Sequence, residues 1–517
     1  MRSPEPSSFL FFKNRPFFIL YFFMVLQVLV FLAIHFWGVV DGDEGFYLMA
    51  SFLVSQGKRL YIDFYYPQMP LFPYIYAGWM QFFGFTWEGG RSLSWVFSVG
   101  ILFLLHRYFK EKIEDARLLI ILLGCFLFNG LVMGWMTTAK TYAPSTFFTL
   151  LGFICLRETL LKPGRLLGYF LGGLSLGIAG NLRLLFLPLI VPMLLWLIWA
   201  RRGKDYYQTT GLAAILLVGW LLACLISIYY SILDPYRFYW NNLGCHLIRY
   251  PHSRPEVLLQ KMQILGKLMI SPQFCILLVG FVISFLCLLK NRSFLSSQDE
   301  WGSFVIGSFL IGASIFIINL IPSPALIQYF SVLPPFLLIT AVPLLKRLWY
   351  SKEKRKKNLL KVVLLFYFVT ALPTLVFHGI ARPHREDPQT WSLSSVKAIG
   401  KFVRLHSNPG DTLFAQWPGC LFTSGRNPLS GMENHFGYLT SWRLSASENK
   451  YYHLASQDRI LLDIAQKKYS LAILGGWIGW PGLDWAKIEK ELETALVQNG
   501  YTLRKEIGEF QIYSRPH

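Results

Sequence analysis

The chain has little charge for its length. Asp, Glu, Lys and Arg make up 15% of its 517 residues, whereas a soluble domain carries about 25%. Hydrophobic residues make up 54%, and between residues 16 and 380 they recur in runs of about 20, the length that crosses the hydrocarbon core of a bilayer. The shortage of charge therefore excludes an ordinary soluble protein. It predicts an all-α polytopic membrane protein.

Paired cysteines, nucleotide-binding motifs and internal repeats are also lacking. The seven cysteines show no regular spacing, and most of them lie inside apolar runs. Neither a disulfide framework nor a metal site is therefore predicted. The Gly-rich residues 475–479 lack the spacing and context of a dinucleotide-binding loop, so no nucleotide-binding domain is expected.

The charge that is present is mostly positive, with 49 Lys and Arg against 29 Asp and Glu and a net charge of +20. The basic residues concentrate in alternate connections between the apolar runs, which indicates membrane topology and not nucleic-acid binding. By the positive-inside rule these connections, and the N-terminus, are cytoplasmic. They contain Arg107, Lys110, Lys112, Arg117, Arg157, Lys162, Arg165, Arg201, Arg202, Lys204, Lys290, Arg292 and the basic run 346–361.

About eleven membrane spans are predicted from run length. The run that ends at residue 40 is too long for the core of a signal peptide and lacks a cleavage pattern, so it is read as a retained span. An odd number of spans places the C-terminus outside, in the periplasm or the extracellular space of a plasma-membrane protein. The predicted spans are residues 16–40, 91–109, 116–135, 142–161, 166–182, 184–200, 210–233, 272–290, 302–321, 324–345 and 359–380.

The first external loop, residues 41–90, begins with three carboxylates within four residues, Asp41, Asp43 and Glu44. Carboxylates at the edge of a bilayer are costly to desolvate, so they require an explanation. One explanation is structural: Asp41 or Asp43 caps an amphipathic helix that lies along the interface. A rigid turn with two prolines, residues 65–71, and a second short aromatic helix follow.

Two further regions lie outside the spans. The long external loop 234–271 carries His246, Arg249, His252 and several other basic residues, which suit either a helix among lipid headgroups or a ligand site. From residue 381 the composition becomes that of a water-soluble domain. A small α/β unit is predicted there, with helices at 396–405, 459–466 and 485–498 and strands at 412–415, 471–476 and 511–514.

Two lone cations lie near the predicted external ends of spans. Arg183 stands between two apolar runs, so it either snorkels to the interface or faces a cavity. Lys140 is the only basic residue of its connection, which topology alone does not explain and which favours anion binding. A carboxylate beside cations at one membrane face suits transfer from a phosphate-linked lipid, in which the cations hold the leaving phosphate and the carboxylate deprotonates an acceptor.

The order of motifs around the first external loop resembles that of a known family. Asp43-Glu44-x-x-Tyr47 is followed by Leu60-Tyr61-Ile62-Asp63-Phe64, then Pro67-x-x-Pro70-Leu71, then Arg91-x-x-Ser94, and much later by Gln328-Tyr329 and Pro334-Pro335. This series resembles the GT-C superfamily of polyprenyl-phosphate-sugar glycosyltransferases. Within it, the sequence is most similar to the branch of protein O-mannosyltransferases and the lipid A aminoarabinose transferase.

The resemblance implies a GT-C fold and an external active site, with Asp43 as the catalytic base and Glu44 beside it. It implies a polyprenyl-phosphate-linked sugar donor, an envelope acceptor that is a lipid, glycan or protein, and contact with the lipid bilayer. No cofactor and no nucleic acid are expected. The donor phosphate is expected near Lys140, Arg183 and Tyr329, and the supporting loop positions are Tyr47, Gln68 and Arg91.

The sequence departs from the family pattern at two places. Relatives often carry His, Glu or Lys just before the second proline of the loop, serving a metal or the donor phosphate, whereas Gln68 and Met69 stand here. Many relatives also have a second acidic residue in the next external loop, where this chain has Lys140-Thr141-Tyr142. No metal is therefore predicted, and one carboxylate is expected to act alone.

Two other functions fit a membrane protein of this kind. A transporter or lipid-linked sugar flippase also places charges within the membrane, but repeat symmetry and paired broken helices are missing. A polysaccharide polymerase or ligase also has large external loops, but relies on loops rich in Arg and His. The favoured interpretation is a glycosyltransferase with a membrane domain at 1–380 and an external α/β domain at 381–517.

Overall fold

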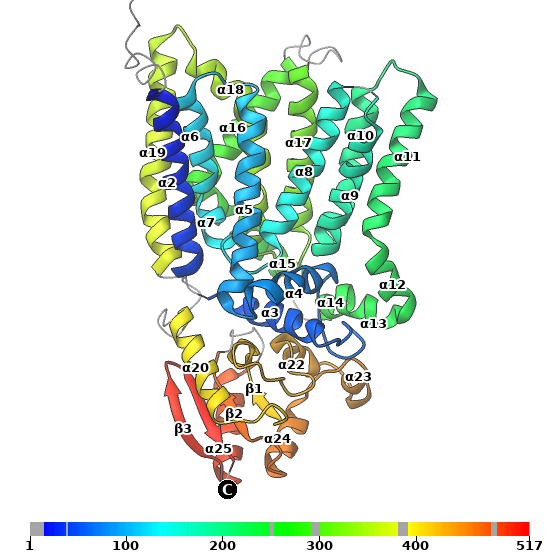
Figure 1. Ribbon diagram of the computed structural model, residues 1–517, viewed down its shortest axis with the longest axis vertical. Helices are drawn as coiled ribbons and strands as arrows, with labels where there is room; N and C mark the ends of the chain where they lie inside the picture. Colours follow the sequence, from blue (N-terminus) through cyan, green and yellow to red (C-terminus); the bar gives the residue numbers. More distant parts are fainter. Residues whose placement is uncertain are drawn as a thin grey trace, which may run out of the picture.

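Long helices stand side by side, and smaller elements pack beneath one end of them (Figure 1). The computed structural model describes residues 15–37, 40–162, 164–248, 253–290, 300–380, 391–476 and 483–515. Helices α3 (Gly42–Ser55) and α4 (Leu71–Phe83) lie between the long helices and a C-terminal α/β unit. We call this the site end of the molecule. The predicted fold class, a polytopic helical protein with a small α/β unit, is confirmed.

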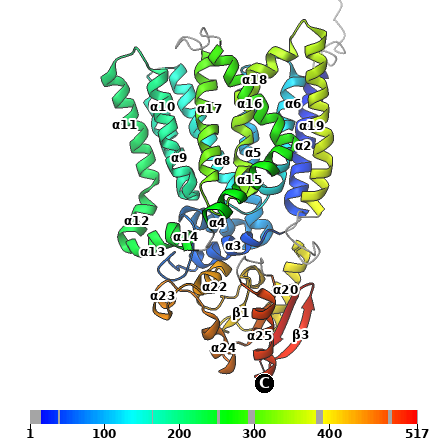
Figure 2. The same ribbon diagram turned by 180° about the vertical axis from the view of Figure 1, so that it is seen from behind.

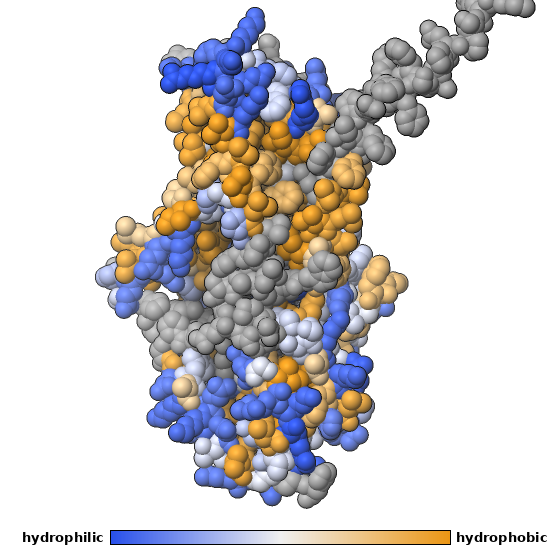
Figure 3. Space-filling view, turned by 90° about the vertical axis from the view of Figure 1, so that its left-hand side faces the viewer, coloured by the Kyte–Doolittle hydropathy of each residue, from blue (hydrophilic) through white to orange (hydrophobic). Residues whose placement is uncertain are grey.

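Each predicted span contains a helix. Within the described residues, α5, α11, α16 and residues 302–320 of α17 are long and apolar enough to cross a membrane by themselves, and the other helices are shorter, interrupted or more charged. Figure 3 shows the resulting hydrophobic band below a hydrophilic end. The helices are α2 (Arg15–Trp37), α5 (Trp87–Lys110), α6 (Ala116–Leu127), α8 (Tyr142–Leu161), α9 (Leu166–Leu182), α10 (Ile190–Ala200), α11 (Tyr206–Ala223), α16 (Pro272–Lys290), α17 (Glu300–Leu320), α18 (Pro334–Trp349) and α19 (Lys354–Ile380).

Several predicted spans are interrupted. The span predicted at 116–135 breaks after α6, because the side chain of Asn129 accepts a hydrogen bond from Leu131 N at 3.1 Å and starts a new helix, α7 (Gly130–Trp135). The 3₁₀ turns η1 (Leu184–Leu189) and η4 (Ile327–Val332) begin two other spans. Helix α12 (Leu225–Leu233) continues from α11 after a break at Cys224. Helix α12 lies toward the site end (Figure 1).

Helices α9 and α11 pack closely because glycine lies at their contact. A Cβ on Gly173 would lie 1.8 Å from the backbone oxygen of Leu216, and one on Gly219 would lie 2.2 Å from that of Phe170. Any side chain at either position would push the helices apart. Small residues at such contacts are typical of helix association in membranes, where close van der Waals packing replaces the hydrophobic effect.

The loop predicted at 234–271 is folded into short helices that brace the first loop. They are α13 (Pro235–Tyr239), a π turn, α14 (Cys245–Ile248) and α15 (Arg254–Ile270), which packs on α16 and η4 (Figure 2). Tyr66 N donates to Asn241 Oδ1 at 2.9 Å, and His246 Nε2 donates to Pro67 O at 3.1 Å. Arg249 and His252 lie outside the described residues.

The C-terminal unit contains a four-stranded mixed sheet in the order β1-β2-β4-β3. β1 (Leu413–Ala415) pairs in parallel with β2 (Leu471–Leu474), and β4 (Phe510–Ser514) is antiparallel to both β2 and β3 (Thr502–Ile507). The predicted helices correspond to α20 (Leu393–Leu405), α24 (Gln457–Ala465) and α25 (Trp485–Gln498). Strand β3 was not predicted, because it is charged and exposed. Residues 381–390, where the domain boundary was predicted, lie outside the described residues.

The first loop and the C-terminal unit share one hydrophobic core. Val40 N donates to Trp391 O at 2.7 Å, and Trp417 Nε1 donates to Gly42 O at 2.7 Å. The Trp417 ring also stacks on that of Trp87, with centroids 5.8 Å apart. The C-terminal unit therefore packs directly against α3 and forms a wall beside it.

Candidate active site

Asp41 is the N-cap of helix α3. The sequence leaves Asp41 and Asp43 as the two alternatives for this cap. Asp41 Oδ1 accepts a hydrogen bond from Asp43 N at 3.0 Å, while Glu44 Oε2 accepts one from Asp41 N at 2.9 Å. This reciprocal capping box satisfies backbone donors that the first helical turn would otherwise leave without partners. It also fixes Asp43 on that first turn, where its side chain is 20% exposed.

Glu44 is the buried carboxylate of the cluster. Arg91 Nε and Nη2 donate to its two oxygens at 2.8 and 2.6 Å, and Ala139 N donates to Oε1 at 2.8 Å. Both side chains of the ion pair are almost completely buried. The oxygens of Glu44 are thus occupied by protein donors. These contacts hold the start of α3 against α5, and a catalytic role for Glu44 beside Asp43 stays a prediction.

Lys140 lies between the two aspartates. Its Nζ is 2.9 Å from Asp41 Oδ1 and 2.6 Å from Asp43 Oδ2, and its side chain is 2% exposed. Burial alone would lower the pKa of Lys140, but the two adjacent carboxylates outweigh burial and hold it well above its ordinary value. Lys140 is therefore a permanent cation here. The sequence predicted a phosphate-binding role for it, and the structure places it on carboxylates.

Arg183 and Tyr329, both predicted near the donor phosphate, lie in contact. The Arg183 guanidinium is 4.7 Å from the ring centroid of Tyr329 and 4.8 Å from that of Tyr142. Lys140 Nζ is 5.4 Å from the Tyr142 ring centroid as well, so the same ring touches both cations. Arg183 Nε is buried and has no hydrogen-bond partner among the described residues. Such an unused donor on a buried guanidinium is suited to a ligand oxygen.

The supporting positions Tyr47 and Gln68 lie in the first loop, on α3 and in the proline turn. Tyr47, one turn after Asp43 on α3, is buried, and burial together with the Asp43 charge raises the pKa of its hydroxyl above the ordinary value. It therefore stays protonated. Gln68 is half-buried in the proline turn, and its backbone oxygen accepts a hydrogen bond from Tyr61 OH at 2.6 Å.

The C-terminal unit packs against α3 one turn beyond Asp43. Phe46, one turn along, packs against Phe436 and His435 of α22 (His435–Ser441), with centroids 5.7 and 6.0 Å apart. His435 is completely buried. Sequence reasoning missed these contacts, since nothing in the order of residues connects α22 to the first loop. It also missed Tyr142, although an aromatic residue two positions from a lone lysine was visible.

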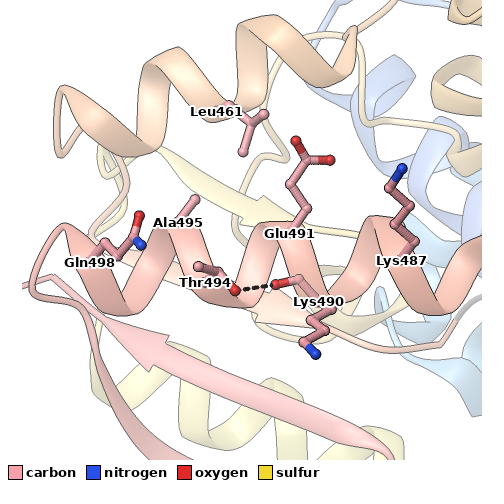
Figure 4. A pocket seen from close by; sticks show the side chains of 7 residues that line it. All are labelled: Leu461, Lys487, Lys490, Glu491, Thr494, Ala495 and Gln498. Carbon is pink, nitrogen blue, oxygen red and sulfur yellow. Dashed lines mark hydrogen bonds between the residues drawn. The ribbon is translucent and has the colours of Figure 1, made fainter.

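A shallow pocket elsewhere on the molecule shares no residue with this cluster. It lies between α24 and α25 of the C-terminal unit, and its walls carry Lys487, Lys490 and Glu491 on one exposed helix face (Figure 4). These side chains do not converge on a point, and Thr494 Oγ1 is already bonded to the backbone oxygen of Lys490 at 2.7 Å. The Asp43 cluster is the better candidate for chemistry.

Solved structures match the chain over nearly its whole length. ArnT from Cupriavidus metallidurans bound to undecaprenyl phosphate superposes with a TM-score of 0.67 at 12% identity, over 96% of this chain and 97% of that one. The fold is that of GT-C membrane glycosyltransferases. The archaeal oligosaccharyltransferase AglB from Archaeoglobus fulgidus, in complex with an inhibitory peptide and a dolichol-phosphate, has a TM-score of 0.53 at 11% identity, over 98% and 75%.

A structure of the Archaeoglobus fulgidus oligosaccharyltransferase in complex with zinc and sulfate matches as well, with a TM-score of 0.52 at 11% identity over 95% of this chain and 73% of that one. Comparison with protein-family models and with curated protein sequences found no match. The GT-C fold expected from the first loop is thus confirmed for a multi-pass membrane protein. At this identity the likeness concerns the fold, so residue roles follow from the geometry.

Proposed function

We propose that the protein is a glycosyltransferase that moves a sugar from a polyprenyl-phosphate donor to an envelope acceptor. The observation that carries the proposal is the cluster at the start of α3, where Asp43 is accessible beside the Arg183–Tyr329 contact. The full-length likeness to ArnT, which was solved with undecaprenyl phosphate, supports a donor of this class. AglB, solved with dolichol-phosphate, supports it too.

In the proposed reaction Asp43 takes the proton of an acceptor hydroxyl or amine. The acceptor atom then bonds to C1 of the sugar as the bond between C1 and the phosphate oxygen breaks, so the anomeric centre is inverted and polyprenyl phosphate leaves. Arg183 and Tyr329 hold the leaving phosphate, because a guanidinium stabilises negative charge as it develops there. The ion pair between Glu44 and Arg91 holds the start of α3 in place against α5.

The orientation belongs to the same proposal. The basic connections, such as that between α18 and α19, lie at the end of the bundle opposite α3 and the C-terminal unit (Figure 1). If they are cytoplasmic, by the positive-inside rule, the N-terminus is cytoplasmic and the site faces the periplasm or the exterior. The membrane domain at 1–380 then carries an external domain at 381–517.

A divalent metal fits this cluster poorly, although one solved neighbour contains zinc. In the part of the chain that the structure describes, no three His, Cys, Asp or Glu side chains gather as metal ligands. The ammonium group of Lys140 also bonds to the two aspartates that would be the nearest ligands. It would repel an incoming cation and compete for the same oxygens. No step of the proposed reaction is therefore assigned to a metal.

The test is a transfer assay on the full-length protein in nanodiscs, with undecaprenyl-phosphate-linked hexoses and pentoses as donors. Envelope glycans and lipids of a deletion strain, analysed by mass spectrometry, identify the acceptor as the molecule that loses a sugar. Asp43→Asn is expected to reduce turnover about 10²- to 10⁴-fold, the usual contribution of a general base. Asp63→Asn is the matched control, because Asp63 lies in the same loop but forms only an exposed pair with Arg59.

Wild-type turnover by Asp43→Asn would remove Asp43 as the base. If the deletion strain keeps its glycans and lipids intact but shows altered solute uptake, the result would contradict the transferase. It would support a transporter or lipid-linked sugar flippase instead.

A further inference from the structure

The ammonium group of Lys140 lies between the carboxylates of Asp41 and Asp43. Its Nζ contacts one oxygen of each carboxylate, at 2.9 and 2.6 Å. Both distances are those of charge-assisted hydrogen bonds. The lysine comes from the connection between α7 and α8, about a hundred residues from the aspartates in sequence, so the contact is made only by the fold.

The side chains around the ammonium group of Lys140 hold it in this position. Its side chain is 2% exposed, and the rings of Trp135 and Tyr142 lie on it with centroids 5.5 and 5.4 Å away. Two of its three N–H donors are directed at carboxylates. Moving it away would leave two partly buried negative charges without a counter-ion, which is unfavourable. A side chain held in this way is fixed and is not a mobile phosphate anchor.

Arg183 differs from Lys140 in this respect. The part of the chain that the structure describes offers no hydrogen-bond acceptor to Arg183 Nε, and its guanidinium contacts aromatic rings. Lys140 and Arg183, the two cations of the site, thus have different kinds of partner. One is bound to the protein's own carboxylates, and the other has a donor to spare for a ligand.

We propose that Lys140 is a built-in cation that takes the place of a divalent metal and holds Asp43 in position for its role as base. The proposal rests on the proposed transferase activity. It predicts that transfer proceeds without divalent metal. It also predicts that Lys140 acts on turnover, through the position of Asp43, and not on the affinity for the donor phosphate.

The first experiment uses the wild-type protein in nanodiscs, with and without excess EDTA. Transfer is expected to be equal in both. If EDTA abolishes transfer and Mn²⁺ restores it, the built-in cation is overturned while the transferase stands. If no donor supports transfer under either condition, the proposed function itself has failed. This experiment needs no variant, so it is independent of folding defects.

The second experiment compares Lys140→Gln with Lys140→Arg, and Lys397→Gln serves as the matched control because Lys397 forms a surface ion pair with Glu88. Lys140→Gln is expected to lower kcat on the order of 10²-fold with an unchanged KM for the donor. Lys140→Arg is expected to recover part of the loss, since the charge returns. A raised KM with an unchanged kcat in Lys140→Gln would show a phosphate-binding role and overturn the proposal.

The third experiment supplies a third carboxylate. Lys140→Glu is expected to gain a Mn²⁺ site, because its carboxylate then faces those of Asp41 and Asp43. Mn²⁺ should therefore raise its apparent Tm, as any ligand of the folded state does, and leave that of the wild type unchanged. A rise in Tm of the wild type with Mn²⁺ would show that Lys140 does not occupy the cation position.

Discussion

Arg91 forms two parallel hydrogen bonds to the carboxylate of Glu44, 2.8 and 2.6 Å long, although the two residues lie 47 positions apart. Arg91 Nη1 donates to His35 O at 3.1 Å in addition. The pair therefore joins the start of α3 to α5 and α2. A buried pair of this kind adds little net stability, but breaking it on one side is costly.

Arg91→Met is expected to destabilise the protein by about 3–5 kcal/mol, because it leaves Glu44 buried without a counter-ion. The double variant Glu44→Gln with Arg91→Met removes both charges and is expected to be less destabilised than the single variant. Thermal unfolding in detergent, followed by tryptophan fluorescence, measures both. As a control, Arg59→Met removes one side of an exposed pair and is expected to cost about 1 kcal/mol or less. A double variant as unstable as the sum of its single variants would contradict this coupling.

Arg183→Met is expected to raise the KM for the polyprenyl-phosphate donor about 10- to 100-fold, the effect of losing one charge-assisted hydrogen bond. The donor titration measures it, with kcat followed in parallel. Arg165→Met, on an exposed connection at the opposite end of α9, is the matched control and should behave as the wild type. An unchanged donor KM in Arg183→Met would instead support an arginine that only snorkels to the interface.

Gly45→Ala is expected to weaken the contact between α3 and the C-terminal unit. A Cβ there would lie 2.6 Å from Cε2 of Trp417, and such overpacking typically costs about 1–3 kcal/mol. Limited proteolysis should then cleave the C-terminal unit faster, and turnover should fall. Gly78→Ala on α4 is the control, because a Cβ there meets nothing within 4 Å. Equal protease resistance of Gly45→Ala and wild type would show that the indole can move aside.

Glu433 makes stability depend on pH. Burial raises its pKa from 4.5 to about 7, with Gly431 N and the charges of Lys58 and Arg459 opposing the effect only in part. Between these two values the unfolded chain loses this proton and the folded protein keeps it, so stability falls as pH rises.

Glu433→Gln is therefore expected to match the wild type at about pH 4.5 and to melt at a higher temperature above about pH 7. Thermal melts across this range test it, and Glu506→Gln, on the exposed strand β3, should keep the pH dependence of the wild type. If Glu433→Gln gains nothing at high pH, the burial of a neutral Glu433 is contradicted.

The sequence predicted the helical bundle well, because the length of an apolar run is a local property. Interruptions within it were harder to predict. Asn129 breaks one run by capping a new helix, and a single polar residue inside an apolar stretch does not reveal whether it caps or packs. Strand β3 was missed because pairing with β4, and not its own charged residues, makes it a strand.

At the candidate site, the sequence predicted a group of charged residues but not how they pair. The cap at Asp41 is local and was predicted. The contact of Lys140 with Asp43 spans 97 positions, and the run of residues between them gives no measure of spatial distance. One signal was available: lone charges of opposite sign at the same membrane face are costly to desolvate apart, so they tend to pair.

The core shared by the first loop and the C-terminal unit has a consequence for the synthesis and folding of the protein. The wall over α3 begins at Trp391, about 300 residues after the loop ends, which corresponds to on the order of 15 to 60 seconds of synthesis at 5 to 20 residues per second. During that interval Gly42 and Phe46 lack their contacts with Trp417 and Phe436, which have not yet been synthesised. Each new molecule therefore inserts its first loop before the residues that cover α3 have been made.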